Sequence, residues 1–96
     1  MRLRFRPEAR LDILEARQWY ESRTAGLGSE FARSVDAAAA GILRFPESHP
    51  QVHGDVRKAI LRRFPYSLLY VTKEGEITVF ACFHHRRDPH TWSDRI

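Results

Sequence analysis

The sequence of 96 residues contains a single cysteine, Cys82, which excludes an intramolecular disulfide framework. Its uninterrupted apolar stretches are only a few residues long, whereas a membrane-spanning helix needs ~20. Basic residues near the N-terminus are not followed by an apolar run, so no signal peptide is expected. Five glycines and five prolines are ordinary usage and exclude collagen-like or low-complexity chains. These absences predict a soluble, cytoplasmic protein that does not associate with a membrane.

The composition is that of a chain with one hydrophobic core. Hydrophobic residues make up 43% of the sequence and aromatic residues 11%, which excludes intrinsic disorder. We therefore expect residues 1–96 to form one domain, since a chain of this size needs neither metal nor disulfide to fold. The net charge is +4. Residues 57–96 hold eight basic and four acidic side chains, which accounts for the whole excess.

Apolar spacing predicts two helices in the first half of the chain. Apolar residues recur every three or four positions in residues 8–22 and again in residues 29–45, a pattern typical of amphipathic helices. Gly26 and Gly28 lie between them and suit a tight reversal, and Ser29 is a favourable N-cap. Two helices with so short a connection predict an antiparallel αα-hairpin.

The rest of the chain has the composition of strands. Residues 3–6 alternate apolar and charged side chains, which predicts a strand before the first helix. Residues 46–54 contain two prolines and a glycine and are expected to form a loop, before β-rich runs at 56–64, 66–72 and 77–83. Strict alternation would place Ile77, Val79, Ala81 and Phe83 on one face, and Thr78, Phe80, Cys82 and His84 on the other. The predicted fold is α+β: an N-terminal strand, an αα-hairpin and a three-stranded antiparallel sheet, with the sheet's second face more open.

A first basic cluster lies in the predicted strand at residues 56–64. On a strand, Arg57 and Arg63 would share one side, and Lys58 and Arg62 the other. With Phe64 and Tyr66 interleaved, such a surface could hold phosphates and stack bases. The structural alternative is a solvated sheet face whose edge charges discourage aggregation.

A second basic cluster, His84-His85-Arg86-Arg87, follows the last predicted strand. Adjacent cations could form an anion site and keep an imidazole neutral, and therefore available as a base. The structural alternative is that Asp88 caps a terminal turn and Trp92 packs on the helices.

Other kinds of active site find little support in the sequence. His49 and His53 lie in a proline-containing loop, with no cysteine or carboxylate at a matching metal-ligand spacing, so no metal site or cofactor is expected. Ser67 is embedded in a strand with no nucleophile elbow, which argues against a Ser-His-Asp triad. Cys82 is expected to be an inert thiol of the core.

Several of these segments together resemble one protein family. They are Trp19-Tyr20-Glu21, Gly26-Leu27-Gly28 with Phe31, Phe45-Pro46 with Pro50, Val52 and Arg57, Arg63 to Tyr70, and His84 to Pro89 with Trp92. The pattern is similar to the RelE/ParE superfamily of toxins from bacterial type II toxin–antitoxin modules, nearer the ParE branch. It covers nearly the whole chain, and the fold that it implies is the one predicted from the periodicities.

The resemblance implies two alternative activities. ParE-type toxins poison DNA gyrase, whereas RelE-type toxins cleave messenger RNA on the ribosome with basic side chains and a tyrosine near the C-terminus. Here Trp92 stands where that tyrosine is expected, and an indole cannot transfer a proton as a phenol does. The gyrase activity is therefore the favoured prediction. In the nuclease alternative, the catalytic residues would be Arg57, Arg63, His85 and Arg87. A third alternative is a family member that has lost its toxicity or acts on another protein target.

The resemblance also implies binding partners. We expect a cognate antitoxin to neutralise the chain and to mediate any contact with operator DNA. An acidic amphipathic segment of that antitoxin would suit apolar grooves rimmed by arginine. The residues predicted to bind the antitoxin are Phe5, Trp19, Tyr20, Arg57 and Arg63. Those predicted to bind the target are Arg62, His84, Arg86, Arg87 and Trp92.

Overall fold

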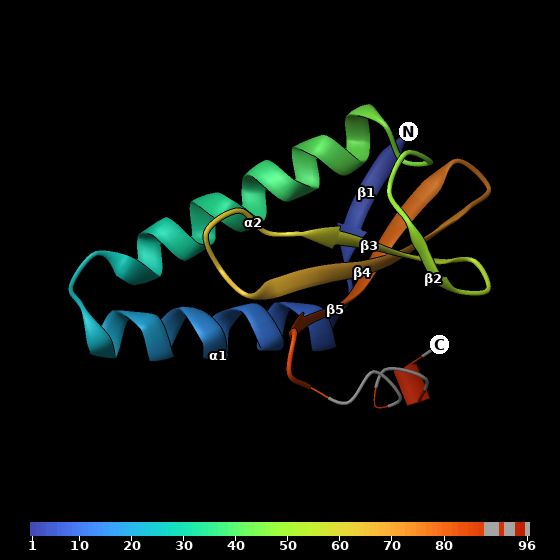
Figure 1. The fold of residues 1–96 in the computed structure, drawn as a ribbon. Helices are drawn as coiled ribbons and strands as arrows, with labels where there is room; N and C mark the ends of the chain where they lie inside the picture. The colour runs from blue at the N-terminus through green and yellow to red at the C-terminus, as the bar shows by residue number, and fades with distance from the viewer. Residues whose placement is uncertain (88–90, 92–93, 96) are drawn as a thin grey trace.

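The computed structural model describes residues 1–87, 91 and 94–95 of the chain. The elements in order are β1 (Arg2–Phe5), α1 (Pro7–Arg23), α2 (Leu27–Arg44), β2 (Gln51–His53), β3 (Val56–Ile60), β4 (Tyr66–Lys73) and β5 (Glu76–His84). The predicted α+β class is confirmed, and Figure 1 shows the helical hairpin beside the sheet. No helix in the part of the chain described is long and apolar enough to cross a membrane.

The sheet has five strands in the order β1-β5-β4-β3-β2, rather than the three predicted. The three predicted strands are present, but β1 joins the same sheet by pairing in parallel with β5. The additional strand, β2, lies in the segment predicted to be a loop and pairs antiparallel with β3. It is short and its three residues are all exposed, so it has no alternation of buried apolar and exposed polar residues that a sequence pattern could reveal.

The reversal between the helices depends on Glu21. Its carboxylate accepts hydrogen bonds from the backbone N–H groups of Gly26 and Gly28, both at 2.9 Å. Gly26 has a φ of 91° and is the N-cap of α2, which therefore begins two residues before the predicted cap Ser29. A Cβ atom at Gly28 would lie 2.8 Å from the carbonyl oxygen of Arg17. Both glycines are thus required, one by its backbone conformation and the other by the close approach of the helices.

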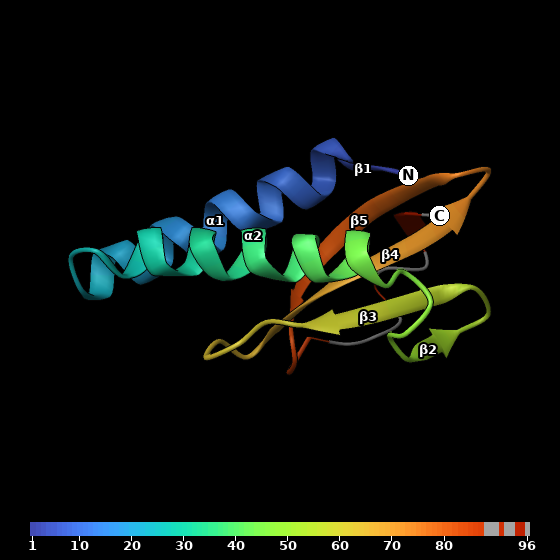
Figure 2. The same cartoon turned by 90° about the horizontal axis from the view of Figure 1, so that it is seen from above.

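The main core lies between the helical hairpin and one face of the sheet, and Figure 2 shows both helices on that side. An aromatic cluster of Tyr20, Phe31, Phe64 and Tyr66 joins the two helices to β4 and the segment before it. Tyr70 is fully buried, and its hydroxyl donates to the carbonyl oxygen of Pro46 at 2.6 Å. This bond satisfies the phenol and holds the loop that follows α2.

The opposite face of the sheet carries a second buried cluster, made up of Val56, Leu69, Phe80, Ala81 and Phe83. That face is therefore less open than expected. Leu69 pairs with Ala81 while Tyr70 pairs with Val79, so Phe80 is an extra residue in β5. The bulge reverses the alternation, because a residue added to one strand shifts every later side chain to the other face.

The predicted faces of β5 are therefore wrong beyond Phe80. Ala81 and Phe83 belong to the second cluster, whereas Cys82 packs in the main core with Ile77 and Val79. Phe80 and Cys82, predicted to share a face, lie on opposite faces.

Candidate functional site

A groove with a volume of about 690 Å³ lies between α1 and the C-terminal end of β5. We call it the helix-side groove. One part of its wall comes from α1. The other part comes from β4 and β5, from the residue before β4 and from the residues after β5. Its lining comprises Asp12, Glu15, Ala16, Trp19, Tyr20, Pro65, Tyr66, Cys82, His84, Arg86 and Arg87. The groove thus contains predicted antitoxin-binding residues and predicted target-binding residues together.

Aromatic side chains form one wall of the helix-side groove. Trp19 is 50% exposed and packs edge-on against Tyr20, with ring centroids 5.1 Å apart. The guanidinium of Arg23 lies over the Trp19 ring at 4.6 Å. Burial raises the pKa of both Tyr20 and Tyr66, so these phenols stay neutral. This wall therefore combines an apolar surface with the hydroxyl groups of two tyrosines.

His84, Arg86 and Arg87 form the other wall. The His84 ring packs edge-on against Tyr66 at 5.1 Å, and its Nδ1 accepts the backbone N–H of Arg86 at 2.9 Å. Arg86 and Arg87 are exposed. Within residues 1–87, 91 and 94–95, neither of these arginines forms an ion pair. Their charge is thus accessible to a ligand in the groove.

A smaller cavity of about 220 Å³ lies on the sheet face opposite the helices. We call it the sheet-side pocket. In it, the hydroxyl of Ser67 and Nε2 of His85 are hydrogen-bonded at 2.9 Å. The guanidinium of Arg87 lies 3.8 Å above the centre of the Phe83 ring. The pocket is lined by Val52, Lys58, Ser67, Leu69, Phe83, His84, His85 and Arg87.

The first basic cluster does not form the strand surface that the sequence suggested. β3 ends at Ile60, so Arg62 and Arg63 lie beyond it, and Arg63 has a positive φ of 71°. Arg63 pairs with Glu30 of α2 at 3.4 Å. Arg57 donates to the carbonyl oxygens of Glu47 and His49 at 2.9 and 2.6 Å. The prediction that Arg57 and Arg63 share one side of a strand is therefore wrong.

The predicted nuclease residues are accordingly not assembled in one cavity. His85 and Arg87 both line the sheet-side pocket, whereas Arg57 holds the loop after α2 and Arg63 lies against that helix. Arg62 and Arg63 line a separate surface cavity beside Glu30.

The predicted antitoxin contacts are also divided. Trp19 and Tyr20 line the helix-side groove, whereas Phe5 is half-buried against the main core. Arg57 and Arg63 lie outside the groove. Trp92, predicted to contact the target, and Asp88, predicted to cap a turn, lie outside the residues that the structure describes.

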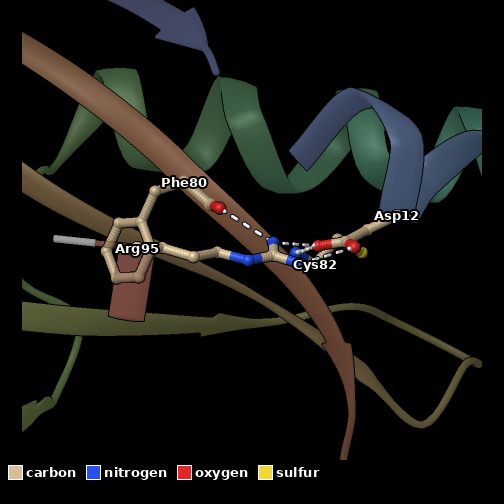
Figure 3. A network of polar contacts seen from close by, with 4 residues as sticks. All are labelled: Asp12, Phe80, Cys82 and Arg95. Atoms are coloured by element: carbon tan, nitrogen blue, oxygen red, sulfur yellow. Dashed lines mark hydrogen bonds and ion pairs between the residues drawn. The ribbon is translucent and has the colours of Figure 1, made fainter. Parts of the chain in front are cut away.

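An ion pair between Asp12 and Arg95 was missed by the sequence patterns (Figure 3). Two guanidinium nitrogens of Arg95 contact the two carboxylate oxygens at 2.7 and 3.2 Å. The side chains are only 8% and 18% exposed, and the hydrogen bond to Asp12 raises the pKa of Arg95. The available signal was helical spacing, since Asp12 lies three residues after Ala9 and four before Ala16, which are both buried.

This ion pair continues the hydrogen bonding of β5 where β1 ends. The backbone N–H of Cys82 donates to Asp12 at 3.0 Å, and Arg95 donates to the carbonyl oxygen of Phe80 at 3.1 Å. Arg6 in turn donates to the carbonyl oxygen of Arg95 at 2.7 Å. The end of β5, from which the second basic cluster projects, is thus supported by side chains in place of a neighbouring strand.

Metal binding and thiol chemistry find no support in the described residues. No group of three or more histidine, cysteine, aspartate or glutamate side chains among them could hold a metal ion. Cys82 is buried as predicted, and burial, with a smaller contribution from Asp12, raises the pKa of its thiol to about 12. Such a thiol is protonated at neutral pH and is therefore a poor nucleophile.

Comparison with known proteins finds a family model and a similar fold. A family model described as the ParE toxin of the type II toxin–antitoxin system parDE matches residues 3–89. Among solved structures, a chain described as the chromosomal ParDE TA system from P. aeruginosa matches with a TM-score of 0.65. The match has 18% sequence identity and covers 88% of this chain and 95% of that chain, so it shows the fold alone. No curated protein matches the chain.

Proposed function

Since the chain belongs to the family of ParE toxins of type II toxin–antitoxin systems, we propose that it inhibits growth by binding and poisoning DNA gyrase. It acts in the cytoplasm as a single domain, without a cofactor, and a cognate antitoxin neutralises it. Contact with operator DNA takes place only through that antitoxin. The family membership supports the toxin role, and the choice of target depends on the surface described next.

The observation that carries this proposal is the composition of the helix-side groove. Trp19 is half exposed beside it, and the exposed cations Arg86 and Arg87 line the opposite wall. Tryptophan, tyrosine and arginine are the side chains that dominate the energetics of protein–protein interfaces. The groove therefore suits a protein ligand better than a small substrate that must be turned over.

The same groove suits an antitoxin segment with acidic side chains. Charge complementarity with Arg86 and Arg87 would speed the encounter, and Trp19 would cover the apolar side of the segment. Trp19 and Tyr20 are the predicted antitoxin contacts that line this surface.

One observation favours the alternative, a ribosome-dependent endoribonuclease. His85 and Arg87 line the sheet-side pocket together with Lys58, so a base and two cations share one cavity. General acid–base cleavage also needs a proton donor placed opposite the base. The predicted partners Arg57 and Arg63 are engaged elsewhere in the fold, which makes this alternative the weaker one.

The two activities are separated by parallel assays of the purified chain. We expect inhibition of gyrase supercoiling, and no cleavage of ribosome-bound message. Replacing both groove arginines, Arg86→Ala with Arg87→Ala, should lower the inhibition at least about tenfold, since each charged contact contributes roughly 1 kcal/mol or more.

A matched control removes the same charge from the helices, Arg17→Ala with Arg44→Ala, and should inhibit like the parent chain. Message cleavage that is abolished by His85→Ala would instead establish the nuclease. Full inhibition by the groove variant would exclude the groove as the gyrase-binding surface.

A further inference from the structure

We propose that the sheet-side pocket is a binding site for a phosphate ester. The pocket lies on the face of the sheet opposite the helical hairpin, although His84 and Arg87 at the strand end line both cavities. The groups that would hold the ester are Lys58 of β3, Ser67 of β4, and His85 and Arg87 after β5. The inference concerns binding alone and does not depend on gyrase being the target of the toxin.

The charge of the pocket is of one sign. Lys58 and Arg87 are cations, the two histidines can donate hydrogen bonds, and no carboxylate is among the described residues that line it. Three other cations, by contrast, are neutralised by a carboxylate: Arg4 pairs with Glu76, Arg63 with Glu30 and Arg95 with Asp12. A concave surface with cations and no anion favours a negatively charged ligand.

Ser67 supplies a neutral donor at the bottom of the pocket. The residue is only 3% exposed. Its hydroxyl oxygen lies 2.9 Å from Nε2 of His85. When Nε2 carries a proton, the ring donates to Ser67 and leaves the hydroxyl proton free for an anion. The pair can therefore present a directed donor between Lys58 and Arg87.

Arg87 is held in an orientation that suits this role. Its guanidinium lies 3.8 Å over the Phe83 ring, a cation–π contact that restricts a long side chain. The Phe83 ring itself is buried in the second cluster and cannot move freely. A planar guanidinium fixed in this way can form two parallel hydrogen bonds with a phosphate.

The apolar part of the pocket indicates an ester rather than a free phosphate ion. Leu69 and Phe83 line it beside the donors, and Val52 of β2, which is itself exposed, lies at its rim. The volume of about 220 Å³ exceeds what one inorganic phosphate needs. A ligand with a phosphate and an attached sugar or ring would use both the polar and the apolar lining.

The proposal is tested by NMR titration of the ¹⁵N-labelled full chain with inorganic phosphate, adenosine 5′-monophosphate and a short single-stranded oligothymidylate. We expect saturable shifts at Lys58, Ser67 and His85. Adenosine 5′-monophosphate should bind at least about threefold more tightly than inorganic phosphate, because only the ester reaches the apolar lining.

Two substitutions and one control address the site. Lys58→Gln should weaken binding of adenosine 5′-monophosphate about fivefold and Ser67→Ala about threefold. Arg44→Gln, which removes a cation from the end of α2, should change it less than about 1.5-fold. Lys58 is only half-buried, whereas Ser67 is buried, so the Lys58→Gln variant is expected to fold even if Ser67→Ala does not.

The oligonucleotide distinguishes the two sources of a phosphate ester. Binding about tenfold tighter than that of the mononucleotide, and weakened by Lys58→Gln, identifies the ligand as a nucleic-acid backbone. Equal affinity identifies a free nucleotide. Shifts that do not saturate, or equal weakening by Lys58→Gln and Arg44→Gln, would overturn the proposal. Loss of phosphate binding with gyrase inhibition intact would leave the proposed function standing.

Discussion

Two segments, residues 57–63 and residues 84–87, are both rich in basic side chains but have different roles in the fold. In the first, Arg57 holds the loop after α2 through two carbonyl oxygens, and Arg63 pairs with Glu30. In the second, Arg86 and Arg87 form no ion pair with any described residue and line cavities. The difference indicates that a cation already hydrogen-bonded or paired within the protein is less available to bind a ligand.

The cause of the difference is the position of each segment relative to the sheet. Arg57 lies inside β3, next to a loop whose carbonyl groups accept its hydrogen bonds. Residues 84–87 lie at and beyond the end of β5, where the described chain provides few acceptors. A residue at a strand end is free to project into a cavity, as is usual for binding residues on a rigid scaffold.

The largest effect is expected from removing the Asp12–Arg95 ion pair, which holds the end of β5 from which residues 84–87 project. Asp12→Ala breaks the buried ion pair and leaves the Arg95 guanidinium and the N–H of Cys82 without their acceptor. Breaking one side of a buried ion pair costs about 3–5 kcal/mol, and we expect a loss of this size in urea unfolding. Arg4→Ala, which breaks the exposed pair with Glu76, is the control and should cost less than about 1 kcal/mol. Equal losses would mean that the Asp12 pair does not support the strand end.

The structural role of the first segment predicts an intermediate effect. Arg57→Ala removes two hydrogen bonds to backbone carbonyl oxygens and should lower the free energy of unfolding by about 1–3 kcal/mol. Gyrase inhibition, normalised to folded protein, should stay unchanged. Arg62→Ala tests the same segment without those bonds and should be nearly neutral for stability. A stable but inactive Arg57→Ala variant would show that the first segment contacts a partner after all.

The sequence patterns predicted the fold better than the site. Helical spacing found both helices because each buries one side against a sheet, and the paired glycines marked the reversal around Glu21. Alternation failed in β5 because a bulge at Phe80 has no signature in an apolar run. The cluster at residues 84–87 was recognisable because it follows a strand.

The environment of residues 84–87, however, depends on contacts between residues that are far apart in the sequence. Asp12 and Arg95 are 83 positions apart, and Ser67 reaches His85 only through strand register. No local pattern contains such contacts.

The strand end that carries the second segment has a pH dependence of its own. The ordinary pKa of the thiol is 9.0. Below that pH the Cys82 thiol is protonated in both the folded and the unfolded chain and does not affect stability. Above pH 9 the unfolded chain releases this proton, whereas the folded chain keeps it up to about pH 12. Stability therefore falls as pH rises through this window, by about 1.4 kcal/mol per pH unit. Urea unfolding at pH 8 and pH 10 should show a larger loss in the parent chain than in Cys82→Ala, and identical pH dependence in both would contradict the burial of the thiol.

The smallest effect on stability is expected from the second segment itself. Arg86→Ala with Arg87→Ala removes side chains that are exposed and form no ion pair with the described residues. The double variant also removes the packing of Arg87 on the Phe83 ring at 3.8 Å, and an exposed cation–π interaction contributes about 0.5–1 kcal/mol. We therefore expect the free energy of unfolding to fall by less than about 1 kcal/mol, while inhibition in cells is largely abolished. A larger decrease in stability would mean that these arginines, like Arg57, serve the fold. In that case, both basic segments would have a structural role.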